Sequence, residues 1–147
     1  MKYVLDTNIL LIYLRNHPLS TFLETQYDPF SLPNIPIVSV VSVGEIQSLA
    51  LRNNWGRKRV EVLNEFLNEL VITSINSQDV IQRYAEIDAY SQVKLFDKPL
   101  DGSSRNMGKN DLWIASTASV AEATLITADS DFHHLDGEFL DVIKVDL

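Results

Sequence analysis

Apolar positions along the chain fall into short continuous runs and into longer stretches with helical spacing. The run Ile37–Val41 is apolar and β-branched without polar alternation, which is typical of a strand buried on both faces. Residues Arg57–Leu70 instead place apolar side chains three and four positions apart, which predicts an amphipathic helix. The pattern therefore predicts short buried strands separated by helices.

The same pattern divides the whole chain into alternating elements. Strands are expected at Lys2–Leu5, Ile37–Val41, Val71–Ile75, Thr124–Thr127 and Val142–Val145, and helices at Asp6–Arg15, Pro18–Gln26, Ser42–Asn53, Arg57–Leu70, Ser77–Phe96 and Asp111–Glu122. No repeat or interdomain linker interrupts this order, so residues 1–147 are expected to form one domain. Such alternation predicts an α/β fold, with a parallel sheet of about four to five strands and helices on both faces.

Composition is compatible with this fold and excludes some kinds of site. Of the 147 residues, 46% are hydrophobic and 22% charged, which is ordinary for a globular domain with a core of its own. The absence of cysteine excludes disulfides and cysteine-ligated zinc. The longest apolar stretch near the N-terminus, Ile9–Leu14, is too short to span a bilayer, so no membrane segment is expected.

The net charge of −8 argues against a protein that grips nucleic acid through bulk positive charge. If RNA is the substrate, bound cations or local basic patches must offset the repulsion. Positive residues do cluster, at Arg52 with residues 57–59 and at Arg105 with Lys109. Ordinary solvated helix ends and loops explain each of these patches equally well.

Five acidic residues follow predicted strands or begin predicted helices. In parallel sheets, ligands bind beyond the carboxyl ends of the strands, so these acids are expected to face one common edge. They are Asp6, Glu45, Asp111, Asp129 and Asp131.

Each acid also has a simple local interpretation. Asp6 fits a helix N-cap, and the segment Ser42–Glu45 fits a capping box. Asp111 is favoured by the dipole of its helix, and the segment Asp129–Asp131 is typical of a turn. None of these positions would indicate catalysis alone.

Together the acids predict a metal site. Carboxylates held close together repel one another and raise each other's pKa values, and a divalent cation relieves that repulsion. Mg²⁺ and Mn²⁺ prefer such oxygen ligands, and a metal bound there can activate water against a phosphodiester. Asn8 and Thr127 are candidates to support this site. The residues thus predict a metal-dependent phosphodiesterase.

Four segments spread over nearly the whole chain resemble the PIN-domain ribonucleases, and more specifically the VapC-type toxins of bacterial toxin–antitoxin pairs. They are Tyr3–Leu10 (YVLDTNIL), Ser39–Ile46 (SVVSVGEI), Gly108–Ser116 (GKNDLWIAS) and Leu125–Phe132 (LITADSDF).

The resemblance implies that Asp6, Glu45, Asp111 and Asp129 ligate Mg²⁺ or Mn²⁺, and it leaves open whether Asp131 approaches the metal instead of Asp129. It further implies a cytoplasmic endoribonuclease that forms a homodimer and pairs with a small antitoxin. A PIN nuclease of RNA processing without an antitoxin remains an alternative, as does a non-catalytic PIN-like interaction module.

Two other chemistries are less well supported by the residues. A phosphatase that phosphorylates Asp6 would be expected to carry a second Asp two positions later, where this chain has Asn8. The histidines His17, His133 and His134 do not form a plausible set of metal ligands. Hydrolysis by a metal-activated water needs neither feature.

Overall fold

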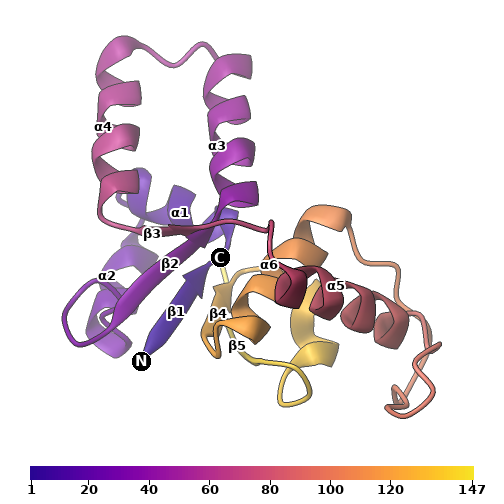
Figure 1. Ribbon diagram of the computed structural model, residues 1–147. Coiled ribbons are helices and arrows are strands. Elements are labelled where there is room, and N and C mark those ends of the chain that lie inside the picture. Colours follow the sequence, from indigo (N-terminus) through magenta and orange to yellow (C-terminus); the bar gives the residue numbers. More distant parts are fainter.

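The computed structural model describes all residues 1–147 and contains one parallel sheet of five strands in the order β3-β2-β1-β4-β5 (Figure 1). The expected α/β fold with a parallel sheet is therefore confirmed. The strands are β1 (Lys2–Leu5), β2 (Ile35–Ser39), β3 (Val71–Thr73), β4 (Thr124–Thr127) and β5 (Asp141–Lys144). The helices are α1 (Thr7–Leu14), α2 (Pro18–Gln26), α3 (Val40–Arg52), α4 (Arg57–Asn68), α5 (Gln78–Ser91), α6 (Lys109–Val120) and the 3₁₀ helix η1 (Ser130–Leu135).

Two apolar cores lie on opposite faces of the sheet. In β1, Val4 belongs to the core formed with α5, α6 and η1, whereas Tyr3 and Leu5 belong to the core formed with α1 to α4. Alternate side chains of a strand point to opposite faces, so a strand covered on both sides is apolar throughout. This explains why the central strands show no polar alternation in the sequence.

Helices α3 and α4 form a hairpin that projects away from the sheet in Figure 1, while α5 and α6 lie on the other side of the molecule. The hairpin turn is stabilised on its exposed side by Arg59, whose guanidinium carbon lies 3.9 Å from the centre of the Trp55 ring. None of the helices has the length and hydropathy that a membrane-spanning segment requires.

The predicted boundary between the second strand and the following helix was wrong by two residues. Strand β2 begins at Ile35, which pairs with Lys2, and ends at Ser39. The Ser39 hydroxyl accepts a hydrogen bond of 3.1 Å from the amide of Val41, so α3 begins at Val40 rather than at Ser42. Pro36 is tolerated in β2 because β3 pairs with this strand only from Ile37 onward.

The helix predicted over Ser77–Phe96 is also shorter than expected. Helix α5 ends at Ser91, and Val93 has a φ of 58°, in the left-handed region that terminates helices. A β-branched residue seldom adopts this conformation. No glycine or proline stands near Val93 either, so the sequence gives no local signal that the helix ends there. The remaining predicted boundaries differ by a few residues at most.

Candidate metal centre

Asp6 follows β1 directly and lies at the carboxyl edge of the sheet. Its side chain is only 5% exposed, and both of its oxygens accept hydrogen bonds. Oδ1 accepts from the amide of Thr7 at 2.8 Å, and Oδ2 accepts from the hydroxyl of Thr127 at 2.7 Å. Asp6 is thus the N-cap of α1 and, at the same time, a buried carboxylate at the strand end.

Thr127 connects Asp6 to the acidic turn that follows β4. This threonine is fully buried at the end of β4, next to Asp6, which directly follows the adjacent strand β1. Its hydroxyl donates to Asp6 and accepts a hydrogen bond of 3.0 Å from the amide of Asp129. One hydroxyl group therefore fixes the position of a carboxylate and of a neighbouring backbone segment.

Three further carboxylates come together beside this pair. One oxygen each from Asp111, Asp129 and Asp131 lie within 4.8 Å of one another. Asp111 is the third residue of α6, and the other two flank the start of η1. Oδ1 of Asp129 also accepts from the amide of Asp131 at 2.9 Å, so the predicted turn is present and brings both acids to the same place.

Glu45 approaches the site differently from the capping box that the sequence suggested, and that interpretation was wrong. Since α3 begins at Val40, Glu45 lies in the second turn, and Ser42 is buried without a hydrogen bond for its hydroxyl. Glu45 Oε1 instead accepts a hydrogen bond of 2.9 Å from the hydroxyl of Thr7 in α1. Thr7 is a residue that sequence reasoning missed as a site residue, although it lies between the two predicted candidates Asp6 and Asn8.

The neighbouring carboxylates raise the pKa of Asp111 in particular. The pKa of Asp111 is raised to about 7, mainly by burial and then by the nearby charges of Asp6 and Asp129. Glu45 and Asp131 add smaller contributions in the same direction. None of the protein's ion pairs involves any of these acids. The cluster is therefore an uncompensated concentration of negative charge.

The pKa of Asp6 is also raised, with burial as the main cause. The hydrogen bonds from Thr127 and Thr7 lower it, whereas the charges of Glu45 and Asp129 raise it further. An all-oxygen donor set that forms no ion pair, and in which the pKa values of Asp6 and Asp111 are raised, fits a hard divalent ion such as Mg²⁺ or Mn²⁺.

Three other residues near the predicted motifs do not belong to the group of carboxylates. Asn8 is exposed in the first turn of α1, and its side chain makes no hydrogen bond within the protein. His134 Nε2 lies 2.8 Å from the hydroxyl of buried Ser91, between α5 and η1, so its role there is in packing. Gly108 precedes α6, and a Cβ on this residue would lie 3.8 Å from Oδ2 of Asp111.

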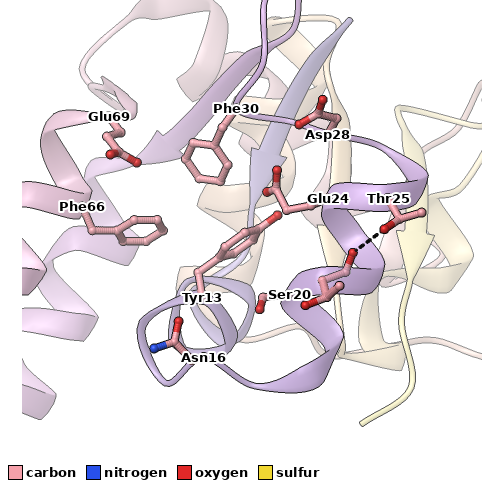
Figure 2. Close-up of a pocket in the computed structure, with 10 residues that line it drawn as sticks. Tyr13, Asn16, Ser20, Glu24, Thr25, Asp28, Phe30, Phe66 and Glu69 are labelled. Carbon is pink, nitrogen blue, oxygen red and sulfur yellow. Dashed lines mark hydrogen bonds between the residues drawn. The ribbon is translucent and has the colours of Figure 1, made fainter.

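A separate cavity of about 670 Å³ opens between α1, α2 and α4 (Figure 2). Tyr13, Phe30 and Phe66 form its aromatic wall, and the Tyr13 hydroxyl points toward the carboxylate of Glu24. Burial and the nearby Asp28 raise the pKa of Glu24. None of the five candidate ligands lines this cavity, so it is distinct from the acidic centre.

Comparison with known proteins identifies the family of this chain. The PIN domain family profile matches residues 3–138, and the chain therefore belongs to the PIN domain family. No curated protein matches the chain significantly.

Several solved structures share the fold over nearly the full length of the chain. A VapBC2 complex from Rickettsia felis, bound to a DNA fragment from its promoter, contains a chain that is 25% identical to this one. The match covers 99% of this chain and 100% of that one, with a TM-score of 0.78. A chain of VapBC-1 from nontypeable Haemophilus influenzae is 20% identical to this one. The match covers 98% of each of the two chains, with a TM-score of 0.75. VapBC-5 from Mycobacterium tuberculosis, of a toxin–antitoxin family, is 22% identical over 98% of both chains, with a TM-score of 0.63.

Proposed function

We propose that residues 1–147 form one PIN-like domain that acts as a metal-dependent endoribonuclease. The observation that carries the proposal is the group of uncompensated carboxylates at the carboxyl edge of a parallel sheet, in a chain of the PIN family. Asp6, Glu45, Asp111 and Asp129 are the proposed ligands of Mg²⁺ or Mn²⁺, with Asp131 as a further candidate.

A divalent ion at this position would supply an activated water and would stabilise negative charge on a phosphodiester oxygen. The protein's own residues have simpler tasks. Thr127 and Thr7 hold the carboxylates of Asp6 and Glu45 in place through their hydroxyl groups. Below about pH 7, Asp111 would have to give up the proton that its raised pKa retains in order to hold a cation. No side chain is needed as a nucleophile.

Replacement of Asp6 by Asn tests the proposal most directly. Asn keeps the size of the side chain and can still accept from the Thr7 amide, but it removes the charge. We expect Asp6→Asn to lose Mg²⁺-dependent cleavage of RNA by at least about a hundredfold while its circular dichroism spectrum is unchanged. Glu65→Gln is the matched control because Glu65 is an exposed acid on α4, outside the site. Full activity of Asp6→Asn would refute the assignment.

The partner and the assembly form a second part of the proposal. The R. felis and H. influenzae relatives are components of VapBC complexes, which supports a toxin role for this chain and a small antitoxin protein as its partner in the cytoplasm. Co-expression with the protein encoded beside this gene should yield a stable complex without Mg²⁺-dependent RNA cleavage. Free, active nuclease under those conditions would favour a role in RNA processing without an antitoxin.

We also propose that the chain forms a homodimer. Strand β3 lies at the edge of the sheet, and its Val71 and Ile72 are 49% and 47% exposed, which leaves apolar surface for a second copy. Light scattering should give twice the mass of one chain. Ile72→Glu should shift the protein to the monomer, and a parent protein that is already monomeric would refute this part.

A further inference from the structure

A shallow groove of about 530 Å³ starts beside Glu45 and follows the exposed face of α3. Glu45, Ser48 and Arg52 lie on one face of the helix because they are three and seven positions apart. Asn110, in the first turn of α6, contributes the opposite wall. The groove is thus continuous with the carboxylate centre through Glu45, whereas Ser48, Arg52 and Asn110 are not among the proposed metal ligands.

Arg52 carries a positive charge that nothing in the protein neutralises. Its Nε donates a hydrogen bond of 3.3 Å to the hydroxyl of Ser48, which directs the side chain back along α3 toward Glu45. The other N–H groups of its guanidinium make no hydrogen bond within the protein, and Arg52 takes part in no ion pair. In a chain with a net charge of −8, an oriented and unpaired arginine next to an acidic centre is suited to an anion.

Gly44 is a second and independent feature of the groove. Glycine inside a helix costs about 1 kcal/mol relative to alanine, so its presence there usually has a packing or functional reason. Packing supplies no reason here, because a Cβ on Gly44 would meet nothing within 4 Å. Its backbone conformation is also not one that favours glycine. The missing side chain leaves the groove open immediately beside Glu45, as close approach of a ligand would require.

We propose that this groove binds the sugar–phosphate backbone of the RNA strand next to the cleaved bond. Arg52 contacts a phosphate, and Gly44 provides the room for the strand. An α-helix rises 1.5 Å per residue, so the backbone of Arg52 lies about 10 Å from that of Glu45. In this proposal Arg52 contacts a phosphate next to the one being cleaved, which makes it a substrate-binding residue rather than a catalytic one. The inference rests on the proposed ribonuclease function.

The groove is tested by RNA binding, separately from cleavage. Binding of a fluorescein-labelled single-stranded RNA of mixed sequence is measured by anisotropy with Mg²⁺, in Asp6→Asn protein so that the RNA stays intact. We expect the added Arg52→Gln change to weaken binding about tenfold and to lower the slope of log affinity against log salt by about one. Arg57→Gln is the matched control, since Arg57 is exposed, ion-paired with Glu61 at 3.2 Å and outside the groove.

Gly44 allows a steric test at the same site. Gly44→Leu introduces a good helix former whose side chain would fill the groove, and it should weaken RNA binding at least as strongly as Arg52→Gln. Gly44→Ala should bind RNA nearly as well as the parent and melt at a higher temperature. Circular dichroism melting verifies that both variants are folded, and the Arg52 result stands alone if Gly44→Leu does not fold.

Cleavage kinetics in protein with an intact Asp6 separate the proposed groove from the proposed ribonuclease activity. Arg52→Gln should raise KM about tenfold with little change in kcat, as loss of uniform substrate binding predicts. Unchanged RNA affinity in Arg52→Gln, or an equal loss of affinity in Arg57→Gln, would refute RNA binding in the groove. Neither result would contradict the proposed ribonuclease activity. A parent protein that binds RNA in the groove but never cleaves it would overturn the nuclease and not the groove.

Discussion

The hydroxyl of Thr127 donates a hydrogen bond of 2.7 Å to Oδ2 of Asp6, across the pairing of β4 with β1. The two residues are 121 positions apart in the chain. This contact lowers the pKa of Asp6 against the larger effect of burial, so it favours the charged carboxylate that a cation requires.

Thr127→Val should therefore weaken both metal binding and the fold. Valine has nearly the same shape but leaves Oδ2 of Asp6 and the amide of Asp129 without their partner. A loss of about 1–3 kcal/mol in the free energy of unfolding is expected for the metal-free protein. Mn²⁺ affinity, measured by isothermal titration calorimetry at neutral pH, should fall as well. Thr127→Ser is the control, since it retains the hydroxyl and should keep most of the affinity.

Metal binding should depend on pH around neutrality. The pKa of Asp111 is about 7, so below that pH the cation must displace a proton, and above it the carboxylate is already free. Mn²⁺ affinity should fall up to about tenfold per pH unit below pH 7 and level off above about pH 8. Calorimetry in two buffers of different ionisation enthalpy counts the released protons. The same affinity at about pH 6 and about pH 8 would contradict the raised pKa.

The same acid should make the metal-free protein less stable as the pH rises. The folded state holds a proton on Asp111 up to about pH 7, whereas an unfolded Asp loses it near 3.8. The contribution of Asp111 to stability is therefore present at low pH and is lost between these two values. Asp111→Asn should remove this part of the pH dependence and raise the melting temperature at neutral pH. Thermal melts in a chelator, from about pH 4 to about pH 8, compare the variant with its parent.

The cavity between α1, α2 and α4 offers a stability test away from the metal centre. Burial and Asp28 raise the pKa of Glu24. At a pH where Glu24 is charged, its carboxylate therefore destabilises the folded state relative to the unfolded state. Glu24→Gln retains an acceptor for the Tyr13 hydroxyl that faces it in Figure 2. A gain of about 0.5 kcal/mol at neutral pH is expected, the size of a single like-charge repulsion. The gain should vanish in acid, where Glu24 is protonated, and an equal gain in Glu65→Gln would show that only net charge matters.

The local sequence pattern was sufficient to predict the bounds of three elements. Lys2–Leu5, Thr124–Thr127 and Pro18–Gln26 have in the structure the bounds that the pattern predicts. The start of α3 was misplaced because Ser39 and Ser42 are both suitable caps. The pairing of Ser39 with Thr73 of β3, which a sequence alone does not contain, shows which of the two serines ends the strand.

The candidate site was predictable as a set of acids but not as a set of contacts. The parallel sheet indicates that Asp6, Asp111 and Asp129 face one edge, and no more than that. The hydrogen bond from Thr7 to Glu45 depends on how α1 packs against α3, for which the sequence has no local pattern. The pKa of Asp111 likewise depends on its depth of burial and on four acids remote in sequence.

Strand order has a consequence for how the protein is made. The first strand, β1, pairs with β4, so the N-terminal residue Asp6 meets its partners only after nearly all of the intervening chain has been synthesised. A growing polypeptide that ends before β4 lacks Thr127, Asp129 and Asp131 and has no complete acidic centre. If the proposed ribonuclease activity holds, the growing chain would be unable to act on the ribosome-bound message from which it is being translated until β4 has paired with β1.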